Sequence, residues 1–180
     1  ELFRKKNLRM LLSYGADGMQ SVVGVVIWPI FIWLILDQNF SAVGIVSSLI
    51  VFASVALRLI VGDLTDRFDK RKVMKWGTIL NAVGWVVKMF VGTGFHIFIA
   101  STYHSFATIV MRTPFDALMY EKAADSGHYI DEYTVLRELA LTLGRLVMMG
   151  LIVASFALTG GSLTVSFLLA GLAALLINKL

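Results

Sequence analysis

Polar side chains recur at helical spacing in an otherwise apolar segment near the start of this sequence. Tyr14, Asp17, Ser21 and Gly24 follow one another at intervals of three or four residues, which places them on one face of a helix. Gln20 lies one turn beyond Asp17. Such a stripe would line a polar cavity. Asp17 is then either a site for a proton or a cationic substrate, or half of a structural ion pair.

Other polar residues lie in apolar segments further along the chain. Arg112 and Arg145 are both candidate partners for Asp17 across a bundle interior, and Arg145 is also a candidate ligand for an anionic substrate. A carboxylate that alternates between an arginine partner and a free state can take up and release a proton. His104 is either a proton relay or a hydrogen-bonded packing residue. Asn81 is expected to bond across helices.

Three further charged residues, Asp116, Arg137 and Glu138, flank one polar connection. We expect them to form gate and loop contacts. Lys88 is expected to extend outward to the aqueous boundary, and the alternative is that it faces the cavity. Trp28 and Trp85 are expected in an interfacial belt at the outer side, and Trp28 is equally a candidate for a ligand cage.

The composition places these residues in a membrane protein. Of the 180 residues, 58% are hydrophobic and 16% are charged, whereas a soluble domain has roughly 45–50% apolar and about 25% charged residues. With a mean hydropathy of +0.80, a soluble fold of this length has too much surface to bury so many apolar groups. A soluble enzyme, a nucleic-acid-binding domain and a disordered tail are therefore excluded. The absence of cysteine excludes a disulfide scaffold and thiolate metal sites.

The predicted fold is all-α, with one bundle of six transmembrane helices over residues 1–180. A membrane helix needs about 20 mostly apolar residues. The predicted helices cover about residues 8–36, 42–61, 73–91, 95–113, 133–158 and 163–178. For the fourth helix, an aqueous extension to Ala123 is an option. Six spans also allow an inverted repeat of three plus three helices.

Lysine and arginine gather at alternate connections, which predicts the orientation. The N-terminus and the loops after the second and fourth helices carry them, whereas the other three loops carry none. Because cytoplasmic loops are the basic ones, both termini are expected in the cytoplasm. The expected location is a cell or inner membrane, crossed several times.

The segment between the second and third predicted helices carries a recognisable pattern of glycine, acidic and basic residues. Its motif residues are Gly62, Asp63, Leu64, Asp66, Arg67, Lys70, Arg71 and Lys72. The segment resembles the cytoplasmic signature of the major facilitator superfamily, G-x-L-x-D-R-x-G-R-K-x, in its expected place between two spans. Asp69 stands where the family usually has glycine, which would stiffen the turn if that position needs a left-handed backbone.

The resemblance implies one six-helix half of a twelve-span transporter. Members of the family hold substrate between two such halves, which rock to alternate access. By this resemblance Asp66 and Arg67 would belong to a cytoplasmic gate. The second half would be a further part of the same chain, a separate chain, or a second copy of this one.

The expected function is secondary transport of a small solute by alternating access, with proton coupling through Asp17 as one option. The expected partners are the lipid bilayer, the solute and the second half, with no cofactor and no nucleic acid. No nucleotide-binding loop, nucleophile–base pair or metal-ligand cluster is visible in the sequence, so an enzyme is not expected. The alternative is a non-transporting membrane scaffold, chaperone or regulatory subunit with the same fold.

Overall fold

Helices account for nearly all of the chain in the computed structural model, which describes residues 5–65, 69–125 and 130–179. No strand occurs in these ranges. The elements are α1 (Lys5–Val22), the π-helical segment η1 (Val23–Ile27), α2 (Trp28–Ile35), α3 (Phe40–Thr65), α4 (Lys70–Lys88), α5 (Gly94–Asp125), α6 (Ile130–Leu158), α7 (Thr164–Leu176) and the 3₁₀ turn η2 (Ile177–Lys179).

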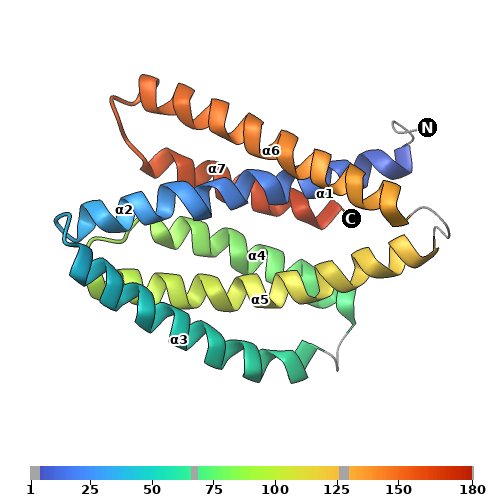
Figure 1. Cartoon of the computed structure of the whole chain (residues 1–180), viewed down its shortest axis with the longest axis horizontal. Helices are drawn as coiled ribbons and strands as arrows, with labels where there is room; N and C mark the ends of the chain where they lie inside the picture. Colours follow the sequence, from blue (N-terminus) through green and yellow to red (C-terminus); the bar gives the residue numbers. More distant parts are fainter. Residues whose placement is uncertain (1–4, 66–68, 126–129, 180) are drawn as a thin grey trace.

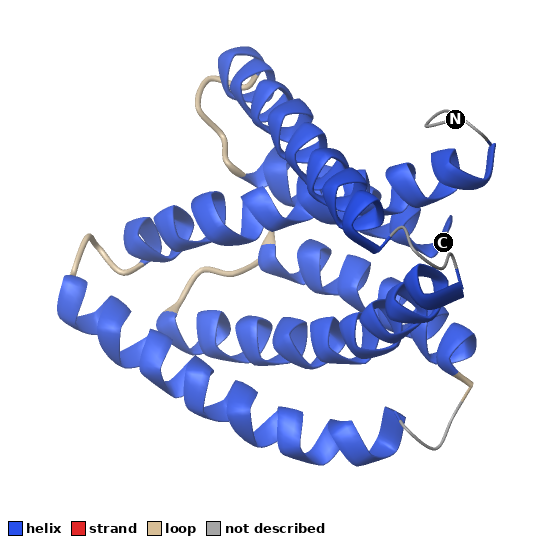
Figure 2. Ribbon diagram, turned by 45° about the vertical axis from the view of Figure 1, so that its right-hand side comes forward, coloured by secondary structure: helices blue, strands red, loops and turns tan. Residues whose placement is uncertain are grey.

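The elements form helical rods that run back and forth along one axis (Figure 1). α1, η1 and α2 make one continuous rod, and α7 continues into η2. The beginning of α1 and the end of α7 lie at the same end of the molecule, together with the end of α3 and the end of α5. α6 and α3 lie on opposite outer sides, with the other helices between them, and the turned view in Figure 2 agrees.

A π-helical segment joins α1 to α2 because of a proline. Pro29 has no N–H to donate and its ring clashes with the preceding turn. The backbone N–H of Trp28 bonds to the carbonyl of Val23, five residues back, and Pro29 then occupies the first turn of α2. The wider turn absorbs the clash, so the rod continues without a break.

The connection between α2 and α3 is tight because two residues adopt a left-handed backbone. Asp37 has φ 51° and Gln38 has φ 61°. The Asn39 side chain then accepts a bond from the Ala42 N–H at 3.1 Å, which satisfies a free donor at the start of α3.

The predicted boundaries lie within three residues of these elements for the first, third, fifth and sixth helices and differ by more at the ends of the second and fourth. α4 begins at Lys70, before the predicted 73, because Asp69 caps it: its side chain accepts the Arg71 N–H at 2.9 Å. α5 runs through Pro114 to Asp125, past the predicted end at 113. The polar residues after Pro114 extend the same helix beyond its apolar part.

The outermost helices present large apolar side chains outward. No residue of the Phe40–Leu59 window of α3 is buried. Exposed large apolar residues on the two outer helices include Ile45, Leu49, Phe52, Val55 and Leu59 on α3, and Leu139, Leu143, Leu146, Val147 and Val153 on α6. Apolar patches of this extent are rare on soluble monomers.

Three helical segments in the described ranges are long and apolar enough to cross a membrane: Leu8–Ile35, Phe40–Leu59 and Tyr133–Leu158. α7 is apolar but shorter. α4 and α5 carry more polar residues, of which Thr78, Asn81, Lys88 and Ser101 are buried in the bundle.

α1 and α6 cross with their backbones in close contact. A Cβ atom on Gly144 would overlap the carbonyl oxygen of Gly15, and one on Gly18 would overlap that of Leu141. Small residues permit this approach between helices. The contact fixes the height of α1, and therefore of Asp17, within the bundle.

The core consists of two apolar clusters. One contains Trp28, Trp85, Met148 and Phe167. The other contains Tyr14, Met111, Phe115 and Leu141. On α1, the second cluster ends at Ala16 and the first begins at Val22, so Asp17 and Gln20 occupy the polar interval between them.

Candidate functional site

Asp17 and Arg112 form an ion pair between α1 and α5. Arg112 Nη2 donates to both carboxylate oxygens of Asp17, at 2.7 Å each. The Asp17 side chain is 4% exposed, whereas that of Arg112 is 46% exposed. The carboxylate is thus inside the bundle, and its cation has one side open to the surroundings.

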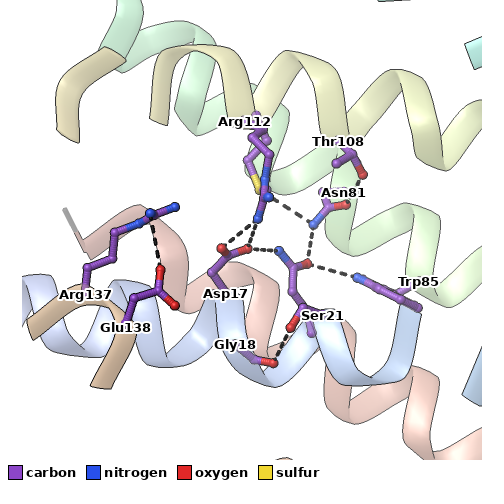
Figure 3. A network of polar contacts seen from close by, with 11 residues as sticks. Asp17, Gly18, Ser21, Asn81, Trp85, Thr108, Arg112, Arg137 and Glu138 are labelled. Carbon is purple, nitrogen blue, oxygen red and sulfur yellow. Dashed lines mark hydrogen bonds and ion pairs between the residues drawn. The ribbon is translucent and has the colours of Figure 1, made fainter. Parts of the chain in front are cut away.

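Amide side chains extend this pair into a network (Figure 3). Gln20 Nε2 donates to Asp17 Oδ1 at 3.2 Å. Gln20 Oε1 accepts from Asn81 Nδ2 at 2.6 Å and from Trp85 Nε1 at 3.1 Å. Thr108 Oγ1 donates to Asn81 Oδ1 at 3.2 Å. The network therefore links α1, α4 and α5, and hydrogen-bonded polar groups of this kind hold a unique arrangement of helices.

Lys88 lies at the end of α4 and points into the bundle, contrary to the expected outward extension. It is 3% exposed. Its Nζ lies 4.5 Å from the ring centre of Trp28 and 4.2 Å from that of Trp85. The two indole faces hold the ammonium by cation–π attraction, which overrides the tendency of a terminal lysine to reach water. Trp28 and Trp85 are likewise core residues and not part of an outer belt.

A cavity of about 430 Å³ opens beside Lys88. It lies between α1–α2, α3 and α5, and its polar lining comprises Lys88, His104 and the hydroxyl residues Ser47, Ser101, Ser105 and Thr108. His104, predicted as a relay or a packing residue, packs edge-on against Trp85 with ring centres 4.4 Å apart. Thr108 belongs to both the cavity wall and the hydrogen-bond network.

The predicted gate residues at the other end of the bundle are partly in contact. Arg137 Nη1 and Glu138 Oε1 are 3.5 Å apart, and both side chains are accessible. The guanidinium of Arg137 lies 5.7 Å from the ring centre of Tyr14. Tyr14 in turn bonds to the Tyr133 hydroxyl at 3.0 Å. These contacts tie the start of α6 to α1.

Asp116 lies on α5 beyond the predicted span and is partly buried. Burial raises the pKa of its carboxyl group, while the nearby guanidinium groups of Arg112 and Arg137 oppose that rise and Asp17 adds to it. Asp116 is therefore electrostatically coupled to both the network and the predicted gate contacts.

The signature segment is only partly within the described residues. Asp66 and Arg67 lie outside them. Gly62, Asp63 and Leu64 form the last turns of α3. The remaining motif residues, Lys70, Arg71 and Lys72, form the exposed first turn of α4.

Two features of the signature region were not anticipated. Asp69 has φ −58° and caps α4, so the position of the family's usual glycine does not have a left-handed backbone here. Lys70 pairs with Glu121 of α5 at 2.5 Å, although Glu121 was not among the predicted gate residues. Their sequence separation of 51 residues gives no local signal.

Arg145, the other predicted partner of Asp17, is exposed on α6 and lies outside the network. The residues that sequence reasoning left out of the candidate site are Trp85, Lys88, Ser101 and Thr108. Trp85 and Lys88 are three residues apart on one helix, a spacing that could have indicated a lysine–aromatic pair.

No cluster of His, Cys, Asp and Glu suited to a metal ion occurs within the described ranges. Comparison of the chain with protein-family models, curated proteins and solved structures gives no match.

Proposed function

We propose that this chain is one six-helix half of a secondary transporter that moves a small solute by alternating access. The observation that carries the proposal is the Asp17–Arg112 pair at the centre of a hydrogen-bonded layer between two apolar clusters. An ionisable pair inside an apolar bundle is expensive to maintain and marks substrate or proton pathways in membrane proteins.

The arrangement of apolar and polar surfaces supports a membrane position for all of the rods. α3 and α6 present apolar faces that suit lipid or a second half. The buried polar residues of α4 and α5, such as Asn81 and Ser101, face protein and add little cost in a bilayer. Exposed basic residues gather at the end where α4 begins, and the described connections at the opposite end, 36–39, 89–93 and 159–163, have none. This asymmetry supports cytoplasmic termini.

The packing of the helices supports an inverted repeat. α1 packs on α6 as α5 packs on α3, and α1 packs on α7 as α5 packs on α4. The contact between α4 and α7 is common to both sets. Exchanging the first three rods with the last three therefore preserves the main pairings. Many transporters are built from repeats of this kind, with substrate bound near the interface.

The ion pair supplies a workable step for proton coupling. A proton delivered to a carboxylate oxygen of Asp17 neutralises it and removes its attraction for Arg112, whose side chain already has an open side. Loss of that proton restores the pair. Because the pair joins α1 to α5, the corresponding rods of the two repeats, its opening and closing would bias their relative position.

Site-directed labelling tests alternating access without knowledge of the solute. The sequence has no cysteine, so Ser105→Cys introduces a single thiol into the cavity wall. In membrane vesicles of both orientations, a membrane-impermeant maleimide should label this thiol from both sides. Adding Asp17→Asn, which mimics the protonated carboxylate, should change the ratio of the two rates.

Thr159→Cys, in the exposed connection between α6 and α7, is the matched control. It should react from one side only, with or without Asp17→Asn. Labelling of Ser105→Cys from a single side, unchanged by Asp17→Asn, would contradict the proposal and favour a non-transporting scaffold.

A further inference from the structure

The cavity beside Lys88 contains a positive charge with no negative partner. Among the described residues, no carboxylate and no hydrogen-bond acceptor contacts Lys88, and its ammonium lies against the rings of Trp28 and Trp85. The nearest buried carboxylate in the network, Asp17, is already bonded to Arg112. Two ring faces offset only part of the cost of removing an ammonium from water.

Unpaired polar atoms surround this charge. Ser101, on α5, is 5% exposed, and its hydroxyl has no hydrogen-bond partner. His104 Nδ1 also lacks a partner and lies against Gly84, where a Cβ atom would be only 2.6 Å away. This packing holds the imidazole in place beside the cavity that it lines. Buried polar groups normally have partners, so the Lys88 ammonium and the Ser101 hydroxyl, which are both donors, indicate a ligand that supplies acceptor atoms.

The rest of the wall is apolar. Trp28, Ile32, Val43 and Ile50 line the same cavity. A volume of about 430 Å³ lies within the range of small-molecule sites, which combine apolar walls with a few convergent polar groups.

We propose that this cavity binds a small organic monoanion, with its carboxylate on Lys88 and Ser101 and its apolar body against the wall of α2 and α3. The ammonium would repel an organic cation. A dianion such as phosphate would need a second free cation, and Arg112 is engaged by Asp17. One carboxylate matches the single charge, Lys88, among the described residues that line the cavity.

The site deepens the proposed function by naming the class of solute, and its role as a cargo site rests on that function. Trp85 connects the two parts, because one face of its ring holds Lys88 while its Nε1 donates to Gln20 of the network. Gln20 in turn donates to Asp17. A bound carboxylate that draws Lys88 away from Trp85 would therefore act on a side chain that bonds to Gln20, a partner of Asp17.

Benzoate is the probe for the test, with benzamide as its neutral analogue and benzyltrimethylammonium as a cation of similar size. The purified full chain in phosphatidylcholine nanodiscs, which offer no net-negative lipid, is titrated with each while tryptophan fluorescence is recorded. Benzoate should bind and quench, and benzamide and benzyltrimethylammonium should each bind at least tenfold more weakly.

Lys88→Met removes the charge and keeps a long apolar side chain, and it should weaken benzoate binding at least tenfold. Lys75→Met is the matched control, because Lys75 is an exposed lysine on the same helix; it should leave the dissociation constant within twofold. Ser101→Ala removes one donor and should weaken benzoate about threefold to tenfold. If Lys88→Met does not fold, the benzoate affinity of Ser101→Ala tests the proposed site in its place.

Equal binding of benzoate and benzamide, or benzoate binding that survives both Lys88→Met and Ser101→Ala, would overturn the site. The two proposals fail separately. Selective benzoate binding without two-sided labelling of Ser105→Cys would retain the site and refute transport. Two-sided labelling without benzoate binding would retain transport and refute this solute class.

Discussion

The Asp17 network and the Lys88 cage stabilise a buried charge in opposite ways; the cage is the Lys88 ammonium held between the rings of Trp28 and Trp85. Asp17 has a full complement of partners, with Arg112 on both oxygens and Gln20 on one of them. Lys88 is buried to a similar degree but has only the rings of Trp28 and Trp85. The first charge is neutralised within the protein, and the second remains available to a ligand.

This difference predicts opposite signs for the removal of charge at the two places. Breaking a buried ion pair by deleting one partner strands the other charge, which is costly. Replacing a buried charge that has no ionic partner removes a desolvation cost instead. A protein that keeps the second arrangement does so at the expense of stability, as is usual for functional sites.

The largest expected effect follows from Arg112→Leu, which leaves Asp17 as an unpaired carboxylate. Deleting one partner of a buried pair costs about 3–5 kcal/mol, and we expect about 3 kcal/mol because Arg112 is half exposed. The free energy of unfolding can be measured by SDS titration in mixed micelles, followed by far-UV circular dichroism. The double variant Asp17→Asn/Arg112→Leu should recover most of the loss. Equal losses of unfolding free energy in the single and double variants would show that the unpaired Asp17 carboxylate is not the source of the destabilisation.

A smaller loss is expected where α1 crosses α6. Gly144→Ala places a methyl group on the carbonyl oxygen of Gly15, two residues before Asp17, and overpacking of this kind costs about 1–3 kcal/mol. Gly150→Ala on the same helix is the control: nothing lies near its Cβ position, so it should gain about 0.5–1 kcal/mol from helix propensity. The same SDS titration should show a loss of unfolding free energy for Gly144→Ala and a gain for Gly150→Ala.

Gly144→Ala also separates the two regions, because it disturbs α1 beside Asp17 and not the residues around Lys88. Benzoate affinity should therefore stay within twofold of the unmodified chain. A loss of benzoate binding as large as that from Lys88→Met would show that the network and the cage are a single structural unit.

The Asp17 network was largely accessible to sequence reasoning. The interval between Asp17 and Gln20 is one helical turn, so their contact follows from helix geometry. Arg112 was one of two candidate partners, and a sequence without tertiary contacts does not choose between Arg112 and Arg145. The choice depends on which face of α6 meets α1, and the backbone contact at Gly15 and Gly144 turns Arg145 outward.

The Lys88 cage was not predicted, because the local rule for a lysine at a helix end favours extension toward water. Trp85 is one turn away and visible in the sequence, but Trp28 comes from another rod and completes the cage only after packing. The π-helical segment before Pro29 rotates Trp28 within that rod. Its effect on side-chain direction is a consequence of backbone geometry that hydrophobic periodicity does not reveal.

Lys88→Met should stabilise the chain, opposite in sign to Arg112→Leu. The variant removes the desolvation cost of an ammonium but loses cation–π attraction worth about 2 kcal/mol in desolvated settings, so the net gain is about 1 kcal/mol. Lys75→Met, on the exposed face of α4, should change stability by less than about 0.5 kcal/mol. SDS titration of both variants without ligand checks the sign. A loss above 1 kcal/mol for Lys88→Met would mean that an unseen internal partner satisfies the charge.

The smallest expected effect is a pH dependence at Asp116, whose carboxyl group is influenced by both Arg112 of the network and Arg137 of the predicted gate contacts. Burial raises the pKa of this carboxyl group above its ordinary value of 3.8. The folded state therefore binds the Asp116 proton more tightly than the unfolded chain does. The protonated side chain contributes its full stabilisation of the folded state at pH values below 3.8, and this stabilisation is lost as the pH rises through the raised pKa.

Asp116→Asn keeps the side chain neutral and should make the chain more stable above that pH window, with no gain below it. Because Asp116 is only partly buried, solvent screening limits the difference to less than about 1 kcal/mol. SDS titrations of the unmodified and variant chains across the window measure it, with Glu138→Gln as an exposed control that should show no such step. A loss of stability of Asp116→Asn above that window instead would mean that Asp116 is stabilised as a carboxylate by Arg112 and Arg137, and that the charge balance of the network extends to the predicted gate contacts.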